Sequence, residues 1–284
     1  MKIIDNDTLK KIQRLAIKTG LKLEGQAAGN RKSLSKGSSV EFSDFREYTA
    51  GDDFRRIDWN AYGRFDKLFV KLFMEEREAP VRIFLDTSLS MNYGQPDKNT
   101  AAKRLAAALA YISVNTYDRV YINPWNSMMQ GTFGPYSTPS SFAKAVNTLE
   151  IIENGGKSNF TEAVAKMEWK TGRGISIVIT DGLVEGGLEE GLKYLKYMKQ
   201  DVYLCQILSP QELAPDIDGA LELVDIETND IIEVTVSGEL FDMYEKLLKQ
   251  FLNNIKQQCK KFGIHYALLP SDMALEEMVL KVAS

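Results

Sequence analysis

The sequence predicts an α/β protein in which a doubly wound, mostly parallel sheet follows a small, irregular, β-containing N-terminal module. From residue 81 onward, short apolar runs bounded by turn residues alternate with segments of helical period, which is the pattern of a parallel sheet covered by helices. Residues 40–76 differ, because they consist of short aromatic-rich pieces. The composition, 44% hydrophobic and 26% charged over 284 residues, is that of a soluble globular chain. We therefore expect two domains, residues 1–79 and residues 80–284.

The N-terminal domain contains three distinct segments. Met1 to Gly20 has the apolar spacing of an amphipathic helix and no apolar h-region, so we do not expect a signal peptide. Glu24 to Ser39 is rich in Gly, Ser, Lys and Ala, which predicts a flexible basic loop. Leu68 to Phe73 alternates loosely between apolar and polar residues, as a strand does.

Charged residues of both signs surround two aromatic side chains, Tyr48 and Trp59, in the same domain. The charged residues are Arg46, Asp52, Asp53, Arg55, Arg56 and Asp58. The alternation of sign favours a local network of ion pairs and aromatic contacts. The alternative is a partner surface, since Arg and aromatic residues are enriched at interface hot spots.

The α/β domain is predicted from its strands, its helices and two further β segments. The expected strands are Val81 to Leu85, Val120 to Asn123, Ile175 to Thr180, Val202 to Leu208 and Ile264 to Leu269. The expected helices are Thr100 to Thr116, Ser141 to Ile151, Thr161 to Trp169, Leu188 to Lys199, Glu239 to Phe262 and Met273 to Val282. Met128 to Phe133 and Leu221 to Val236 predict an antiparallel edge strand and an inserted hairpin.

Charge and composition exclude several classes of partner. A net charge of -4 gives no field that would attract nucleic acid or anionic lipid. No window approaches the roughly 20 apolar residues that span a membrane. Cys205 and Cys259 lie far apart in apolar-periodic segments, which favours neither a disulfide framework nor a thiolate metal site. We therefore expect a cytoplasmic protein without a transmembrane segment or a nucleic-acid partner.

Polar residues capable of binding a metal follow two of the predicted strands. Asp86-Thr87-Ser88-Leu89-Ser90 follows the first strand, and Thr180-Asp181-Gly182 follows the third. A third loop, Gly155 to Thr161, precedes a helix and brings glycines together with hydroxyls. Ligands of doubly wound sheets bind beyond the carboxyl ends of the strands, and Mg²⁺ prefers oxygen ligands. Helix capping explains each cluster taken singly, but the three together favour one site.

These three clusters resemble the metal-ion-dependent adhesion site of von Willebrand factor A domains, and the resemblance spans about Val81 to Ser284. It implies a roughly Rossmann-like sheet with one coordination position left for a partner's Asp or Glu. It also implies that Mg²⁺ or Mn²⁺ is held by Asp86, Ser88, Ser90, a loop hydroxyl and Asp181. The family usually places Thr directly after the loop glycines. Here Lys157 intervenes, so Ser158 is the expected loop ligand and Thr161 the alternative.

The N-terminal domain carries a second resemblance. Its segments are Val40-Glu41-Phe42, Phe45-Arg46-Glu47-Tyr48, Gly51-Asp52-Asp53, Arg55-Arg56-Ile57-Asp58-Trp59 and Leu68-Phe69-Val70-Lys71. They are similar to the bacterial family catalogued as domain of unknown function fifty-eight. Members place this module ahead of a von Willebrand A-like domain and are typically encoded beside AAA+ ATPases of the MoxR type. The resemblance implies a non-enzymatic adaptor or co-chaperone that binds such an ATPase, or its client, through an acidic residue of the partner.

Two other functions compete with the adaptor. Asp86 also resembles the nucleophile of phosphatases of the haloacid dehalogenase type, which would make the protein a metal-dependent phosphoesterase. Those enzymes need a second Asp two residues on, and Ser88 stands there instead. The third possibility is a metal-free structural interaction module. His265, the only histidine, has no second His or nearby Cys with which to build a zinc site, so we expect a structural role for it.

Overall fold

The computed structural model describes residues 3–19, 41–74, 80–169, 172–217, 219–227 and 230–283. The chain divides into two compact units. The larger unit combines Met1–Gly25 with Ala79–Ser284, and the smaller unit is Gln26–Glu78. Each unit is described by itself.

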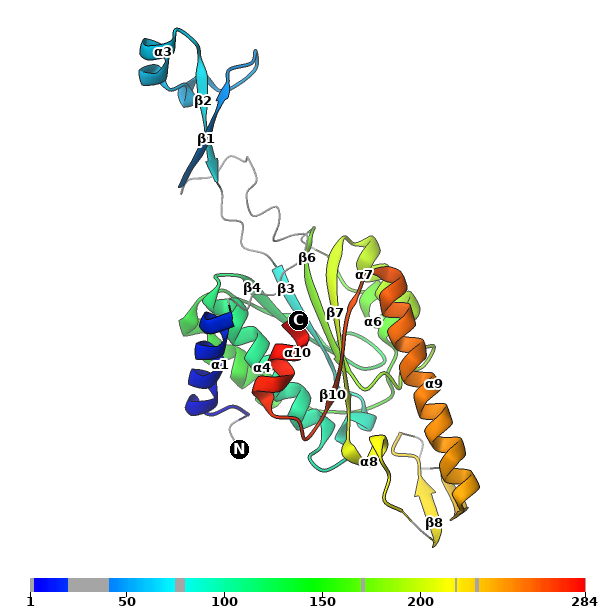
Figure 1. Ribbon diagram of the computed structural model, residues 1–284. Coiled ribbons are helices and arrows are strands. Elements are labelled where there is room, and N and C mark those ends of the chain that lie inside the picture. Colours follow the sequence, from blue (N-terminus) through cyan, green and yellow to red (C-terminus); the bar gives the residue numbers. More distant parts are fainter. Residues whose placement is uncertain are drawn as a thin grey trace. The chain divides into compact units, whose positions relative to one another are not determined.

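The larger unit is built on a six-stranded sheet with the order β10-β7-β6-β3-β4-β5 (Figure 1). All neighbouring strands run parallel except β4 and β5, which are antiparallel. The strands are β3 (Pro80–Asp86), β4 (Arg119–Trp125), β5 (Phe133–Tyr136), β6 (Gly174–Thr180), β7 (Gln200–Leu208) and β10 (His265–Pro270). The predicted fold class, a doubly wound and mostly parallel sheet, is confirmed.

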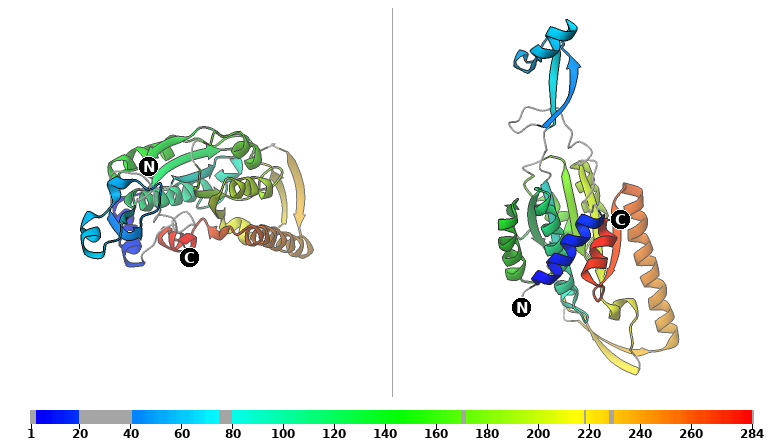
Figure 2. Two further views of the ribbon diagram at one scale, coloured as in Figure 1. Left: turned by 90° about the horizontal axis from the view of Figure 1, so that it is seen from above. Right: turned by 60° about the vertical axis from the view of Figure 1, so that its left-hand side comes forward.

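Helices cover both faces of this sheet (Figures 1 and 2). One face packs against α1 (Asn6–Thr19), α4 (Lys98–Asn115), α5 (Phe142–Ile151) and α10 (Leu275–Ala283). The other packs against α6 (Phe160–Ala165), α7 (Glu189–Tyr197) and α9 (Gly238–Phe262). Successive side chains of a strand point to opposite faces, so Ile83 and Leu85 enter the first core while Phe84 enters the second. Both faces are buried, which explains why the central strands read as continuous apolar runs.

The strand order reverses between β3 and β6. The strand after β3, β4, lies on one side of it, whereas the strand after β6, β7, lies on the opposite side of the sheet. The connecting helices α4 and α7 accordingly pack on opposite faces. Loops that leave such a pair of strands diverge, and this divergence creates the usual ligand position of a doubly wound sheet.

Helix α1 packs within the larger unit. Ile12 is buried in the first core, and the Tyr111 hydroxyl of α4 donates a hydrogen bond to Gln13 Oε1 at 3.2 Å. The helix contacts α4 and α10. The predicted domain of residues 1–79 places this segment with residues 20–79 instead, because amphipathic spacing shows that a helix has a buried face but not which partner covers it.

The edge of the sheet differs from its prediction by a few residues. Strand β5 begins where the predicted segment Met128 to Phe133 ends, and Met129 forms only an isolated bridge to Trp125. The inserted hairpin is confirmed as β8 (Gly219–Val224) and β9 (Ile231–Val236), which pair antiparallel. The short helix α8 (Pro210–Leu213) precedes this hairpin.

The smaller unit is an antiparallel ribbon of β1 (Glu41–Glu47) and β2 (Phe69–Met74), joined by the 3₁₀ turn η1 (Phe54–Arg56) and the helix α3 (Trp59–Phe65). The Arg46 guanidinium lies 2.7 Å from Asp52, and the rings of Trp59 and Tyr62 meet edge to face. The predicted ion-pair and aromatic contacts are therefore present, and Trp59 is also exposed. Helix α3 was not predicted, because its seven residues are too few to show an apolar period.

Among the described residues, no helix is both long and apolar enough to cross a lipid bilayer.

Candidate metal centre

Three loops meet at the carboxyl ends of β3 and β6, where the strand order reverses. They are the loop after Asp86, the Gly155 to Asn159 loop and the loop after Thr180. Backbone hydrogen bonds join the first two, because Gly155 N donates to Thr87 O at 2.7 Å and Leu89 N donates to Gly156 O at 3.1 Å. Gly156 adopts a φ of 73°, in the left-handed region that favours glycine.

The Asp86 carboxylate lies at the centre of these loops. Its Oδ1 accepts a hydrogen bond from Ser88 N at 2.9 Å. Its Oδ2 accepts hydrogen bonds from Thr180 Oγ1 at 2.6 Å and from Ser158 Oγ at 3.3 Å. The third loop thus brings Ser158 to Asp86, whereas Thr161 lies in the first turn of α6.

Ser88 and Ser90 place their hydroxyls next to each other, with 2.9 Å between the two oxygens. Both residues are buried. The short 3₁₀ turn η2 (Leu89–Asn92) holds Ser90 in this position, and Asn154 Nδ2 donates to the Ser88 carbonyl at 3.1 Å. The Asp-x-Ser-x-Ser spacing therefore brings three oxygen-bearing side chains together from a single turn.

Asp181 has a partner that the sequence analysis did not identify. The ammonium group of Lys98, itself fully buried, donates to Asp181 Oδ2 at 2.8 Å and to Glu212 Oε1 at 2.5 Å. Leu183 N donates to Asp181 Oδ1 at 2.9 Å. Lys98 is the first residue of α4, where a positive charge opposes the helix dipole, and this unfavourable placement is the signal that could have identified it.

Burial and charge set the protonation of these groups. Burial, and after it the charge of Asp181, raise the pKa of Asp86 to about 7, against the lowering effect of hydrogen bonds from Thr180 and Ser88. Burial opposes the charged form of Lys98, but the carboxylates of Asp181 and Glu212 outweigh it and raise the pKa of its ammonium. The site therefore holds one carboxylate, Asp86, whose ionisation is costly, and a second, Asp181, whose charge is paired with Lys98.

A divalent cation fits this donor set. Asp86, Ser88, Ser90 and Ser158 offer oxygens, which are the ligands that Mg²⁺ and Mn²⁺ accept. A cation would favour the ionised form of Asp86, which burial disfavours. In the described part of the chain no group of three or more His, Cys, Asp or Glu side chains could hold a metal, so the hydroxyls would have to complete the coordination.

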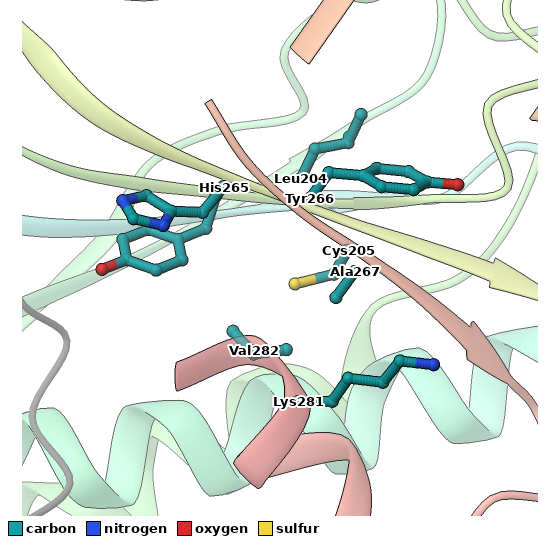
Figure 3. A pocket seen from close by; sticks show the side chains of 8 residues that line it. Leu204, Cys205, His265, Tyr266, Ala267, Lys281 and Val282 are labelled. Carbon is teal, nitrogen blue, oxygen red and sulfur yellow. The ribbon is translucent and has the colours of Figure 1, made fainter. Parts of the chain in front are cut away.

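A cavity of about 190 Å³ lies elsewhere, between β7, β10 and α10 (Figure 3). His265 is on its wall, and its ring stacks on Tyr203 with 4.4 Å between the ring centroids and 12° between the planes. The stacking is the structural role predicted for this histidine. Cys205 also lines the cavity, and burial raises the pKa of its thiol to about 12, so the thiol is protonated near neutral pH.

Solved structures similar to this chain include BatB from Bacteroides thetaiotaomicron, at 22% identity and a TM-score of 0.45, covering 72% of this chain and 97% of that one. An aerotolerance-related membrane protein from Bacteroides fragilis is 21% identical with a TM-score of 0.43, covering 72% of this chain and 98% of that one. At these TM-scores neither similarity supports a statement about function.

The similarity to the uncharacterized protein Rv1480 from Mycobacterium tuberculosis extends over nearly the whole chain. The two are 23% identical over 282 residues, which cover 96% of this chain and 88% of that protein. The model of the family described as "Protein of unknown function DUF58" matches residues 44–250, which include most of the smaller unit and the three loops around Asp86. This chain belongs to the DUF58 family.

Proposed function

We propose that this protein is a non-enzymatic adaptor that binds a partner protein through Mg²⁺ or Mn²⁺. The cation would be held by Asp86, Ser88, Ser90 and Ser158. Asp181 would contribute its carboxylate directly or through a water molecule. The observation that carries the proposal is the Asp86 carboxylate, which is almost fully buried, is surrounded by hydroxyls, and has a raised pKa. When bound, such a cation would offer an anionic side chain of the partner a ligand position.

The charges around the site favour an anionic partner group. Two unpaired carboxylates, Asp86 and Asp181, would nearly neutralise a divalent cation. The ammonium of Lys98 takes up part of the Asp181 charge at 2.8 Å, so a cation at Asp86 would keep more of its positive charge than two unpaired carboxylates would leave it. Ser88, Ser90 and Ser158 are neutral. An Asp or Glu of the partner is the ligand that this charge favours.

We propose that the partner is a MoxR-type AAA+ ATPase or its client, acting in the cytoplasm. This part of the proposal rests on the sequence resemblance of the N-terminal module. Ser88 supports a binding protein over a phosphoesterase, because it stands where that chemistry needs a general acid and its hydroxyl lies 2.9 Å from that of Ser90. Incubation with a generic phosphate ester separates the two, since the adaptor should release no phosphate above the level of an Asp86→Ala variant, which lacks the nucleophile that a phosphoesterase would need.

A pull-down with the purified ATPase tests the proposal. We expect the complex to form in Mg²⁺, to weaken at least tenfold in EDTA, and to weaken equally in Ser88→Ala. The matched control is Ser140→Ala, which removes an exposed hydroxyl from the same unit and should bind like the parent protein. Binding that is indifferent to EDTA and to Ser88→Ala would contradict a cation-dependent adaptor.

A metal-free interaction module is the second candidate, and the buried cluster of Lys98, Asp181 and Glu212 favours it. In that cluster the ammonium already compensates carboxylate charge without a metal ion. Mg²⁺ separates the two candidates, because a ligand that binds only the folded state raises the melting temperature. A metal-free module would melt at the same temperature with and without Mg²⁺.

A further inference from the structure

The strands β8 and β9 pair with each other and with no other strand of the described residues. They form a two-stranded ribbon, Gly219–Val224 with Ile231–Val236, that projects from the larger unit beside the first turns of α9 (Figures 1 and 2). Such a ribbon has two open edges and is marginally stable by itself. A further strand along either edge would therefore stabilise it.

Apolar side chains are exposed on both faces of the β8–β9 ribbon. Leu223 and Ile232 form a cross-strand pair on one face, and Val224 and Ile231 form the next pair on the opposite face. Ile231 and Ile232 are 63% and 62% exposed. Another chain that covers these side chains would gain the free energy of removing their apolar surface from water.

The open edges carry backbone groups that can pair with a further strand. Asp225 N donates to Asp230 O at 2.9 Å, and this bond fixes which residue pairs of the ribbon are hydrogen-bonded. The register then makes Glu222 and Glu233 a non-hydrogen-bonded pair, so their N–H and C=O groups point outward, one set to each edge. Each edge thus offers the donors and acceptors that an added strand uses.

Glu222 and Glu233 also give the ribbon its charge. Side chains of a non-hydrogen-bonded pair are close together, and like charges directly opposite each other are destabilising. Both residues are exposed, and neither has an ion-pair partner among the described residues. Between Lys199 and Lys246 the sequence contains no Lys or Arg. A positive charge that balances this pair would have to come from outside that segment.

We propose that the β8–β9 ribbon receives a third strand from a partner protein, with a Lys or Arg of that strand on the face of Glu222 and Glu233. The neighbours of that basic residue would point to the opposite face, where β-branched apolar side chains would cover those of the ribbon. A second copy of this chain is a poorer occupant, because its own ribbon would bring further acidic side chains to the edge. This interface lies outside the proposed cation site and needs no cation.

Fluorescence anisotropy with labelled synthetic peptides tests the proposal. A peptide that alternates Val and Lys should bind the parent protein, whereas a peptide that alternates Val and Glu should not. The Val–Lys peptide with its backbone amides N-methylated keeps its side chains and charges but has no N–H donors, so it should bind at least tenfold more weakly. Equal binding of the methylated and unmethylated peptides would refute the addition of a strand.

The acidic pair is tested by a double variant, Glu222→Gln with Glu233→Gln. It removes the repulsion within the ribbon, so the ribbon should stay folded and bind the Val–Lys peptide about fivefold more weakly at low ionic strength. The matched control combines Glu153→Gln with Glu277→Gln, which removes the same charge from exposed positions outside the ribbon and should bind like the parent protein. Equal affinities of the two double variants would refute the role of the pair.

Proline variants test the edges themselves. Ala220 and Thr235 form another non-hydrogen-bonded pair, so Ala220→Pro and Thr235→Pro each remove an outward N–H from one edge and leave the β8–β9 pairing intact. Loss of the Val–Lys peptide in either variant, at an unchanged melting temperature, would support the proposal and identify the edge. Full binding by both variants would contradict it.

Two controls separate this interface from the cation site and from self-association. The Val–Lys peptide should bind equally in Mg²⁺, in EDTA and to Asp86→Ala, so failure of the cation site would leave this result unchanged. Peptide binding that requires Mg²⁺ and Asp86 would refute an independent interface. A parent protein that sediments as a dimer, and dissociates in either proline variant, would place a second copy on the ribbon and overturn the proposal of a basic partner strand.

Discussion

Asp86 and Asp181 end neighbouring parallel strands and are buried to nearly the same degree, yet their surroundings differ in charge. Asp181 pairs with the ammonium of Lys98. Asp86 is surrounded by hydroxyls and a backbone N–H, which orient its oxygens without supplying positive charge. The negative charge of Asp181, at the end of β6, is therefore balanced by Lys98. The negative charge of an ionised Asp86, at the end of β3, is not balanced by its hydrogen-bond partners. A bound cation would therefore act chiefly on Asp86.

The largest expected effect comes from removing the charge partner of Asp181. Lys98→Met should leave the Asp181 and Glu212 carboxylates without their cation, one of them fully buried, and should cost about 3–5 kcal/mol in the free energy of unfolding. Urea unfolding at neutral pH measures it. Lys193→Met, which removes a half-buried cation from two surface ion pairs, is the control and should cause little change.

A loss in the free energy of unfolding as small as that of Lys193→Met would show that Asp181 does not depend on Lys98 for charge balance. A second variant tests the same dependence. Adding Asp181→Asn to Lys98→Met should restore part of the lost stability, because the double variant buries one fewer unpaired carboxylate.

The next effect is the pH dependence of stability in EDTA. The pKa of Asp86 is raised from its ordinary value of 3.8 to about 7. Between these two values the folded state binds the proton more tightly than the unfolded state, so stability decreases as pH rises and levels off above pH 7. From pH 5 to pH 8 this group should account for a decrease of about 3 kcal/mol in the free energy of unfolding.

Urea unfolding at several pH values in EDTA measures this slope. Asp86→Asn should remove it, and saturating Mg²⁺ should reduce it because the cation favours the ionised form. A slope that persists unchanged in Asp86→Asn would show that another group causes it.

A smaller effect is expected at the hydroxyl that bridges the two strand ends. Thr180 Oγ1 donates to Asp86 Oδ2 at 2.6 Å and accepts from Gly182 N at 3.0 Å. Thr180→Val should cost about 1–3 kcal/mol in the free energy of unfolding. It should also weaken Mg²⁺ binding at pH 7, because the pKa of Asp86 rises further when this hydrogen bond is lost.

The control for Thr180→Val is Thr148→Val, which removes a buried hydroxyl that lies 2.7 Å from the Tyr136 hydroxyl, away from the proposed site. It should lower stability similarly and leave Mg²⁺ affinity unchanged. Equal Mg²⁺ affinities in the two variants would show that Thr180 supports only the fold.

The sequence predicts those residues of this site that share one turn or that follow neighbouring parallel strands. Asp86, Ser88 and Ser90 share one turn, and the carboxyl ends of parallel strands lie at one edge of a sheet, which brings Asp181 near them. Ser158 was chosen over Thr161 from its place after the glycines, and it is Ser158 that donates to Asp86.

The rest of the site depends on contacts between residues that are distant in sequence. Lys98 lies 83 residues before Asp181 and 114 before Glu212, and no local pattern relates them. Helix α1 was assigned to the wrong neighbours for the same reason.

A cation-dependent adaptor needs a cation at Asp86, and unfolding with and without Mg²⁺ tests for that cation most directly. The parent protein should be stabilised by Mg²⁺ according to its affinity, by about 2.7 kcal/mol at one hundred times the dissociation constant, whereas Asp86→Ala should not respond. An equal response of the two proteins to Mg²⁺, or no response in the parent protein, would contradict a cation site at Asp86.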